Sequence, residues 1–254
     1  MIDLEGKRAL VVGVANEHSI AWGVAEALHD AGAKIAITYL NEKAEPHVRP
    51  LAESIGAPII MEIDVTHDEH EEPLFRRIRE TWGRLDILVH SIAFAPGSDL
   101  HGRVIDSSSR GFATAMDISV HSFIRLARRA EPLMTDGGAC LAMSFYGAEK
   151  VIDTYNLMGP VKAALEATTR ELASELGPMN ITVNALSPGP MATRAASGLA
   201  HFDDLMKDAA DRSPMRRLAT IHDVGAAAAF LASDAARNIT GCVLHVDAGR
   251  HIVG

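Results

Sequence analysis

The chain has 254 residues, 48% of them hydrophobic, which is enough for one large folded domain and argues against a disordered chain. Its formal net charge of -9 and the lack of a basic run argue against binding to nucleic acid or to an anionic membrane surface. No apolar run reaches the about 18 residues of a membrane span, and Cys140 and Cys242 lack CxxC spacing, so we expect a cytoplasmic protein with two reduced, buried thiols.

Short apolar segments alternate with longer amphipathic segments, as expected of a parallel β-sheet with helices on both faces. The first strand is predicted at 8–14, followed by a helix over 19–31 that Gly32 ends. The remaining strands are predicted at 33–39, 58–65, 85–89, 138–143, 181–186 and 242–246. A helix is predicted between 40 and 57, and Pro46 and Pro50 are expected to break it. The remaining helices are predicted at 68–82, in a long region from the end of the fourth strand to 134, at 155–177 and at 222–235.

Seven strands joined by right-handed helical crossovers predict a Rossmann-type, doubly wound parallel α/β sheet in three layers, α/β/α. No linker, repeat or low-complexity stretch divides the chain, so we expect a single domain over 1–254. Such a sheet binds its ligand where the strand order reverses, here between the first and fourth strands. The irregular interval around 190–214 is expected to form a lid over the substrate.

The turn after the first strand contains candidate dinucleotide contacts, although it lacks the common GxGxxG pattern. Gly13 permits a sharp turn that continues through Ala15, and the amides of Ser19 and Ile20 stand at a predicted helix N-terminus, where a pyrophosphate is stabilised. We expect Gly23 to let this helix pack closely on the sheet beside the pyrophosphate. From this turn alone, a tight βα connection without a ligand remains the alternative.

The end of the second strand indicates which dinucleotide is used. Leu40 and Asn41 offer no basic group for a 2'-phosphate, and Glu42 offers an acid. NADH is therefore favoured and NADPH is less expected, although Lys43 leaves NADPH open.

The next two strand ends supply further cofactor candidates. Asp64 is expected to accept a hydrogen bond from the adenine amino group, and Val65 to cover the adenine ring. Ser91, Ile92 and Ala93 close the fourth strand beside the middle of the cofactor. The acidic run that follows the third strand contains His67, Glu69, His70, Glu71 and Glu72. We interpret this run as a solvated helix start, stabilised by the helix dipole, and expect no metal site.

Two tyrosines and one lysine are the candidate catalytic residues. Short-chain dehydrogenases commonly place a tyrosine four residues before a lysine, but glycine occupies the position four residues after Tyr155. Lys162 follows Tyr155 by seven residues, about two turns at ~100° per residue, so both share one face if the helix includes Tyr155. Pro160 fits if that helix begins near Asn156. Tyr155 is preferred over Tyr146, and two ordinary surface side chains remain the alternative on spacing alone.

Several segments together carry a family resemblance, and the most specific is Tyr155 and Lys162 with Met158 and Gly159 between them. The other segments are 13–23, 64–65, 90–97, 187–190, 193–198 and 245–247. Over nearly its whole length the chain resembles the enoyl-acyl carrier protein reductase (FabI) family, a branch of the short-chain dehydrogenase/reductase superfamily. The resemblance implies a homotetramer, a nicotinamide cofactor and a trans-2-enoyl thioester of acyl carrier protein as substrate, in fatty acid biosynthesis.

The resemblance also implies roles for individual residues. Tyr155 would donate a hydrogen bond to the thioester oxygen while hydride reduces the carbon–carbon double bond, and Lys162 would hold the nicotinamide ribose. Tyr146 is retained as a further catalytic candidate. The implied cofactor contacts late in the chain are Pro190, Met191 and Thr193. The implied substrate pocket comprises Phe94, Ala95, Phe145, Tyr155, Met158, Ala195, Leu199 and Met206.

The sequence departs from the family pattern at two places. Phe145 stands where the family often has a tyrosine, which would give the pocket an apolar wall and no donor. Asp203 and Asp204 stand on the predicted lid helix, where basic residues usually attract the acidic carrier protein. Arg194, Arg212, Arg216 and Arg217 are the candidates to replace that basic patch. Otherwise the acyl donor is a coenzyme A thioester or a specialised carrier.

Two other functions remain open from the sequence. The first is a short-chain dehydrogenase acting on a ketone or an alcohol, which the seven-residue spacing disfavours. The second is a regulatory protein that binds NAD without turnover, which requires that Tyr155 or Lys162 be misplaced.

Overall fold

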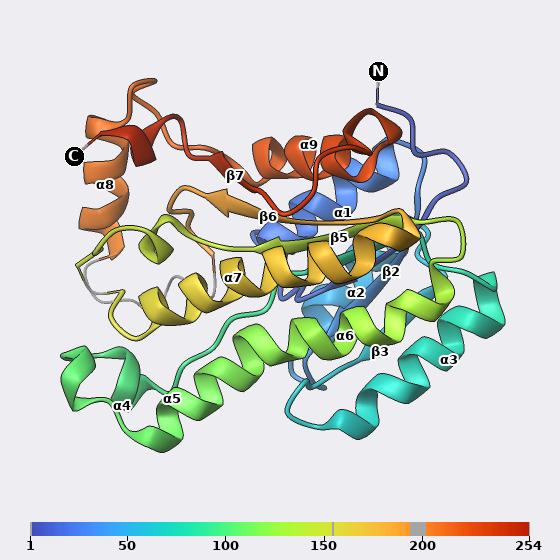
Figure 1. Ribbon diagram of the computed structural model, residues 1–254, viewed down its shortest axis with the longest axis horizontal. Helices are drawn as coiled ribbons and strands as arrows, with labels where there is room; N and C mark the ends of the chain where they lie inside the picture. The colour runs from blue at the N-terminus through green and yellow to red at the C-terminus, as the bar shows by residue number, and fades with distance from the viewer. Residues whose placement is uncertain (1, 154, 194–201, 254) are drawn as a thin grey trace.

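A seven-stranded parallel sheet lies between two layers of helices in the computed structural model, which describes residues 2–153, 155–193 and 202–253 (Figure 1). The strand order is β3-β2-β1-β4-β5-β6-β7, so the order reverses between β1 and β4. This arrangement confirms the predicted doubly wound sheet and the predicted position of its reversal.

The strands agree with their predicted positions to within a few residues. They are β1 (Arg8–Val12), β2 (Lys34–Tyr39), β3 (Ile59–Glu62), β4 (Ile87–His90), β5 (Gly138–Met143), β6 (Ile181–Pro188) and β7 (Val243–Val246). Every neighbouring pair is parallel, and the register places Val12 beside His90 and Met143 beside Leu186. The carboxyl ends of the central strands therefore meet along one edge, where the predicted site residues follow them.

The helices are α1 (Ile20–Asp30), α2 (Glu45–Ser54), α3 (Glu71–Trp82), α4 (Gly97–Leu100), α5 (Ser109–Met116), α6 (Ser122–Ala130), α7 (Met158–Leu176), α8 (Phe202–Arg212) and α9 (Ile221–Ala232). Local chemistry explains several of their ends. Gly83 ends α3 in the left-handed conformation, with φ of 72°. Thr220 and Asp223 form a reciprocal capping box at the start of α9. No helix among the described residues is long and apolar enough to cross a membrane.

Each face of the sheet carries its own hydrophobic core. One core joins the sheet to α1, α2 and α9, and the other joins it to α3, α5, α6 and α7. Alternate residues of β5 divide between the two cores, because Leu141 belongs to the first and Cys140 to the second. Burial raises the pKa of the Cys140 thiol to about 12, and both cysteines are free, although Cys242 is only half-buried.

Two predictions about helices were wrong. Helix α2 runs without a break, because Pro46 lies in its first turn and Pro50 is accommodated inside it. The region after β4 is divided into α4, α5 and α6, and the five residues Asp117–His121 form a π-helical turn between α5 and α6. The helix expected within the lid interval is present as α8.

Gly23 has a different role from the one expected. A Cβ atom at Gly23 would lie 2.5 Å from the Ile221 carbonyl oxygen, and one at Gly225 would lie 2.3 Å from the Gly23 carbonyl oxygen. These two glycines therefore let α1 and α9 pack backbone against backbone. The prediction that Gly23 serves packing on the sheet beside the pyrophosphate was wrong.

The acidic run before α3 is only partly solvated. Glu71 is 1% exposed and forms ion pairs of 2.9 Å with Arg125 and 2.8 Å with Arg129, both on α6. Arg125 also donates to the Val65 carbonyl oxygen and, at 2.8 Å, to Asp117. The interpretation of Glu71 as a solvated residue was wrong, since it joins α3 to α6 through a buried ion-pair network.

Candidate functional site

A cavity of about 200 Å³ lies at the carboxyl edge of the sheet, next to the point where the strand order reverses. Side chains from seven segments of the chain surround it. The lining residues are Ile20, Ser91, Ile92, Ala93, Phe94, Ala95, Leu100, Met143, Ser144, Phe145, Tyr155, Met158, Lys162, Pro188, Gly189, Pro190, Met191, Thr193, Phe202 and Leu205. Tyr155 and Lys162 thus face the same cavity, together with residues expected to bind cofactor and residues expected to bind substrate.

Tyr155 reaches the cavity from outside α7. The helix begins at Met158, so the premise that Tyr155 lies on the same helix as Lys162 was wrong. Asn156 adopts the left-handed conformation, with φ of 42°, and its side-chain amide donates to the Leu100 carbonyl oxygen at 2.9 Å. This turn carries Tyr155 back toward Lys162. Pro160 falls in the first turn of α7, where its missing N–H leaves no bond unmade.

The Tyr155 ring is tightly enclosed. Its centroid lies 4.7 Å from that of Phe145, and a Cβ atom at Gly147 would lie 2.4 Å from the Tyr155 ring. Burial, with a smaller contribution from the negative charge of Glu166, raises the pKa of Tyr155 above its ordinary value. The phenol therefore stays protonated near neutral pH and can act as a hydrogen-bond donor.

Lys162 is a buried ammonium with one protein acceptor in the described part of the chain. It is 4% exposed, and its Nζ donates to the Met143 carbonyl oxygen at 2.5 Å. An ammonium has three N–H donors, so two remain for a ligand in the cavity. Burial lowers the pKa of Lys162 to about 8, and the nearby negative charge of Glu166 acts in the opposite direction.

The π-helical turn between α5 and α6 positions the end of β4. Ser119 in this turn accepts a hydrogen bond from the Phe94 amide at 3.0 Å and donates to the Phe94 carbonyl oxygen at 3.2 Å. Ser122, at the start of α6, lies 2.7 Å from Nε2 of the fully buried His90. Burial, with the positive charge of Lys162, lowers the pKa of His90 to about 3, so this imidazole is neutral. Ser119 in the π-helical turn and Ser122 next to it therefore hold in place the segment that contains Ser91, Ile92 and Ala93.

The predicted phosphate turn is compact and ordered by its own side chains. Gly13 has φ of 111°, and a Cβ atom there would lie 2.2 Å from the Ser91 carbonyl oxygen. Only glycine allows this approach between β1 and β4. Ser19 precedes α1, and its hydroxyl oxygen accepts from the amides of Ala15 and Asn16, each at 3.0 Å. The turn thus leads directly to the N-terminus of α1, where Ile20 lines the cavity.

The predicted adenosine end lies further along the same edge of the sheet, outside this cavity. Leu40 is 53% exposed directly after β2. Asp64 accepts from the Thr66 amide at 2.9 Å and from its hydroxyl at 2.7 Å. Val65 is buried, and its carbonyl oxygen is the acceptor for Arg125. Sequence reasoning missed Arg125, and no local motif marks it.

Among the described residues, two of the catalytic and substrate candidates lie outside the cavity lining. Tyr146 is buried, and its ring lies nearly perpendicular to that of His245 at a centroid distance of 6.4 Å. We therefore leave Tyr146 out of the catalytic set proposed below. Met206 lies on α8 but does not line the cavity. Ala195 and Leu199 lie outside the described residues, as does Arg194.

Sequence reasoning also missed residues that do line the cavity. Phe202 and Leu205 on α8 face it, and Leu100 approaches it from α4. On α8 the signal was present in the sequence, because Phe202, Leu205 and the buried Ala209 recur at spacings of three and four. Met206 fits the same spacings, so periodicity alone does not choose between Leu205 and Met206.

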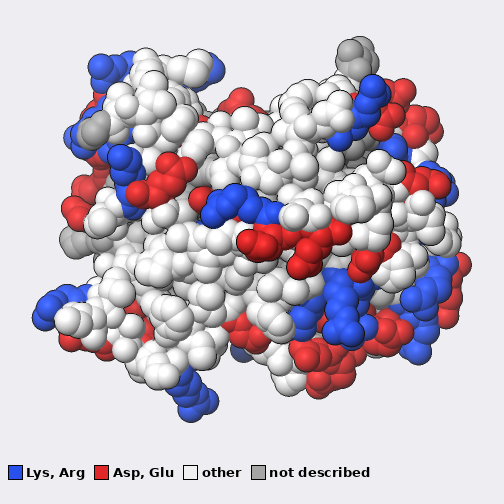
Figure 2. Space-filling view, in the orientation of Figure 1, with Lys and Arg blue, Asp and Glu red and all other residues white. Residues whose placement is uncertain are grey.

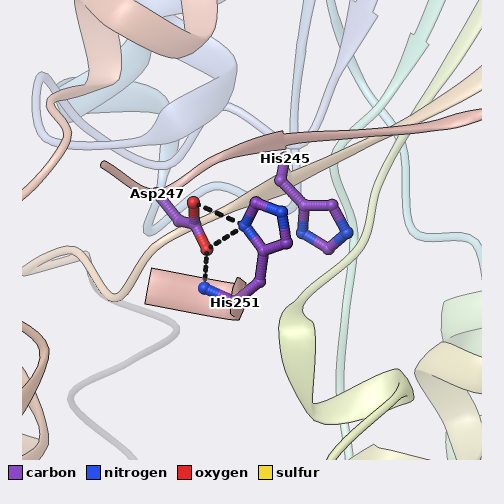
Figure 3. Close-up of side chains that lie close together, drawn as sticks. All are labelled: His245, Asp247 and His251. Atoms are coloured by element: carbon purple, nitrogen blue, oxygen red, sulfur yellow. Dashed lines mark hydrogen bonds and ion pairs between the residues drawn. The ribbon is translucent and has the colours of Figure 1, made fainter. Parts of the chain in front are cut away.

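One group of possible metal ligands occurs in the described ranges, and its geometry opposes metal binding. His245, Asp247 and His251 lie together at the end of β7 (Figure 3). The two imidazole rings are stacked, with centroids 3.9 Å apart and planes 10° apart. Nearly parallel rings cannot direct in-plane lone pairs at one ion. Asp247 instead accepts from the amides of Gly249 and His251 and from Nδ1 of His251 at 3.0 Å, which stabilises the turn after β7.

Comparison with known proteins gives a consistent result. The family model described as Enoyl-(Acyl carrier protein) reductase matches residues 13–251. The enoyl-acyl-carrier-protein reductase (NADH) FabI of Synechocystis sp. is 47% identical over 100% of both chains. A crystal structure of the Anaplasma phagocytophilum reductase in complex with NAD is 47% identical, with a TM-score of 0.95 over 99% of this chain and 96% of that one. The Bacillus cereus reductase with NADP+ and an indole naphthyridinone is 43% identical, with a TM-score of 0.97 over 100% of both chains.

The fold and the cavity define a doubly wound α/β protein of the dinucleotide-binding class. Within that class, the chain belongs to the enoyl-(acyl carrier protein) reductase family.

Proposed function

We propose that this protein is an NADH-dependent reductase of the carbon–carbon double bond of trans-2-enoyl thioesters, acting in fatty acid biosynthesis. The observation that carries the proposal is that the buried side chains of Tyr155 and Lys162 line one cavity at the reversal of the sheet. Membership of a family whose relatives bear this activity in their names supports the same reaction.

The chain has suitable groups for a dinucleotide along the carboxyl edge of the sheet. Gly13 allows the tight turn before α1, whose N-terminal amides suit a pyrophosphate. Two donors of Lys162 suit the ribose hydroxyls, and Asp64 and Val65 suit the adenine. Ser91, Ile92, Ala93, Pro190, Met191 and Thr193 complete the proposed contacts in the cavity. When bound, NADH supplies the hydride for the reduction.

Tyr155 is the proposed catalytic donor. Reduction at the β-carbon places negative charge on the thioester oxygen, and a protonated phenol aimed at that oxygen stabilises the charge as it develops. The raised pKa of Tyr155 supports this role, because the group remains a donor throughout the physiological range. Its packing against Phe145 and Gly147 holds the hydroxyl in place without reorganisation.

The acyl chain is proposed to lie against the apolar part of the cavity. Phe94, Ala95, Phe145 and Met158 provide this surface, and Phe202 and Leu205 of α8 cover it. Phe145 offers no donor, so Tyr155 is the tyrosine that orients the thioester here. Asp203 and Asp204 lie on α8, and Arg212 of that helix pairs with Asp208 at 3.6 Å. Because α8 carries more acidic than basic side chains, it is not expected to attract an acidic carrier protein, so a coenzyme A thioester is a second acyl donor to test.

We further propose a cytoplasmic homotetramer. The first half of α7 presents the small, uncharged residues Pro160, Ala163, Ala164 and Ala167 at the surface. Figure 2 shows a largely uncharged area over this part of the molecule, while charged side chains gather around it. Burial of such a surface between copies is favourable. The free thiols of Cys140 and Cys242 suit a reducing compartment.

One spectrophotometric assay tests the function and separates it from its alternatives. Loss of NADH absorbance with crotonyl thioesters of acyl carrier protein and of coenzyme A is the expected result. Loss of absorbance only with ketones would establish the short-chain dehydrogenase alternative, and binding of NADH without any turnover would establish a regulatory protein. Repeating the assay with NADPH is expected to give the lower efficiency, since Leu40 and Asn41 offer no cation to a 2'-phosphate.

A further inference from the structure

Glu166 is a buried carboxylate that the proposed reaction does not use. It is 7% exposed on α7, and it accepts a hydrogen bond of 2.5 Å from the Ser144 hydroxyl. Lys162 lies four residues before it, so the two side chains are neighbours on one side of the helix. Burial raises the pKa of Glu166, and the negative charge of Glu149 acts in the same direction, whereas the hydrogen bond from Ser144 and the nearby His245 and Arg170 lower it. Ser144 thus favours the charged form of a carboxylate that lies beside the cofactor-binding ammonium.

Ser144 is the first member of a polar row that crosses three neighbouring strands. The register pairs Met143 with Leu186 on β5 and β6, and Ser187 with His245 on β6 and β7. Ser144 extends the first pair by one residue and donates its amide to the Leu186 carbonyl oxygen at 2.7 Å. Because side chains alternate along strands, Ser144, Ser187 and His245 all point to the face that α7 covers.

Two polar atoms of this row are buried without a hydrogen-bond partner in the described part of the chain. Ser187 is fully buried, and its hydroxyl has no hydrogen-bond partner among the residues that the structure describes. Nδ1 of His245 is likewise buried and has no hydrogen-bond partner among these residues. Neighbouring strands lie about 4.8 Å apart, so Ser187 on β6 is flanked in the row by Ser144 on one side and His245 on the other. Buried polar groups of this kind are usually satisfied by ordered water.

The surroundings of His245 fix which hydrogen-bonding role its buried nitrogen takes. Nε2 of His245 lies 3.2 Å from a carboxylate oxygen of Glu149, which can only be an acceptor when ionised. Nε2 therefore carries the proton in the neutral ring, and Nδ1 is an acceptor. Stacking on His251, which Asp247 holds at 3.0 Å, keeps the His245 ring in this orientation (Figure 3).

We propose that one buried water molecule joins Ser187, His245 and Ser144, and that this row keeps Glu166 anionic so that Glu166 holds Lys162 in its charged form. The water accepts from the Ser187 hydroxyl and donates to Nδ1 of His245 and to the Ser144 oxygen, which makes the usual three hydrogen bonds. The Ser144 proton is then directed at Glu166. Glu166 is a positioning residue that acts through Lys162, and the inference rests on the proposed cofactor role of Lys162.

The charge of Lys162 needs this support because burial opposes it. Burial lowers the pKa of Lys162 to about 8, and Glu166 raises it. Among the described residues, two other ionisable groups face Lys162, His90 from β4 and Tyr155 from the segment before α7. Burial keeps both neutral near pH 7, so neither supplies the opposing negative charge. Without the charge of Glu166, the pKa of Lys162 falls further, and a neutral amine binds ribose hydroxyls less well.

The test is the pH dependence of NADH binding, followed by NADH fluorescence between pH 6 and pH 9.5. In the wild-type protein, affinity is expected to fall as the pH rises through the pKa of Lys162. In Glu166→Gln, which keeps the shape of the side chain, the midpoint of this fall is expected about one pH unit lower. Ser187→Ala and His245→Phe are expected to move it in the same direction by less. Thr169→Val is the matched control, because it removes a buried hydroxyl of α7 outside the row.

Unchanged midpoints in Glu166→Gln would overturn the role of Glu166. A higher melting temperature in Ser187→Ala together with an unchanged midpoint would overturn the row, because that is the result of removing an unsatisfied buried hydroxyl. A wild-type protein that binds NADH but does not consume it with crotonyl thioesters would refute the proposed reductase while the midpoints stay measurable. A wild-type protein that binds no NADH would refute both.

Discussion

The floor and the cover of the cavity are built in different ways. The floor is fixed by buried polar contacts, in which Lys162 binds the Met143 carbonyl oxygen and Ser144 binds Glu166, each at 2.5 Å. The cover is α8, which faces the cavity with Phe202 and Leu205 and carries Asp203 on its exposed side. Directional bonds define positions far more sharply than apolar contacts. Changes in the floor should therefore affect the reaction itself, whereas changes in the cover should affect which substrate is accepted.

The largest effect is expected from Tyr155→Phe. Removing the proposed donor to the thioester oxygen should lower kcat by roughly 10²–10³-fold, while the dissociation constant of NADH stays unchanged. Steady-state kinetics with crotonyl thioesters and NADH fluorescence measure the two quantities. Tyr146→Phe is the matched control and should retain kcat within about twofold, since Tyr146 lies outside the cavity lining. A wild-type kcat in Tyr155→Phe would contradict the proposed role of Tyr155 in the reaction itself.

The second effect is expected from Lys162→Met, which keeps the length of the side chain and removes its donors. Loss of two charge-assisted hydrogen bonds to the ribose should raise the dissociation constant of NADH by roughly 10–100-fold. Fluorescence titration of NADH at pH 7 measures this constant. Lys150→Met, at an exposed position, should leave it unchanged. Equal NADH affinity in both variants would contradict the proposed grip on the ribose.

A smaller effect, on substrate choice, is expected from Phe202→Ala in the cover. Removing an apolar contact should raise KM for a long enoyl chain by roughly threefold to tenfold, with little change for a crotonyl thioester. Comparison of KM for four-carbon and longer substrates measures the effect. Met206→Ala on the same helix should change neither value, because Met206 does not line the cavity. Equal effects of both substitutions on KM for both substrates would show that contact between Phe202 and the acyl chain does not determine the preference for chain length.

The smallest effect is expected from Asp203→Lys, which reverses a charge on α8. KM for acyl carrier protein substrates should fall by about twofold to threefold at low salt, and the gain should vanish as ionic strength rises. Coenzyme A substrates carry negative phosphates too, but present fewer charges, so their response should be weaker. Asp30→Lys, at the far end of α1, is the control for a change in net charge alone. A response that is independent of salt would exclude electrostatic attraction at this helix.

The sequence predicted the sheet well because each strand is a short apolar run bounded by breaking residues, a pattern that depends on nearest neighbours alone. Helix α7 shows where such reasoning stops. Its face was assigned by counting back from Lys162 to Tyr155, yet the left-handed turn at Asn156 brings Tyr155 to the cavity from outside the helix. Local periodicity has no information about a turn whose conformation depends on a contact with Leu100.

The buried polar groups were still harder to predict. Glu71 looked like one more acid at a helix start, and only its pairing with Arg125, 54 residues away, makes its burial possible. Ser187 and His245 belong to motifs that were recognised, but their shared row follows from the register of β6 and β7. Contacts between residues so far apart in the sequence are determined by tertiary packing, which patterns within a single sequence do not describe.

One continuous helical rod, from α5 through the π-helical turn to α6, touches both halves of the proposed coenzyme site. Ser119 fixes Phe94 beside the nicotinamide half, and Arg125 fixes Val65 at the adenine half. The spacing between those two anchor points is set by six residues of a single rod, so stretching one half away from the other would require the rod itself to deform. Coenzyme analogues that differ in overall length should consequently lose more binding affinity than analogues that differ only in the substituents of their rings.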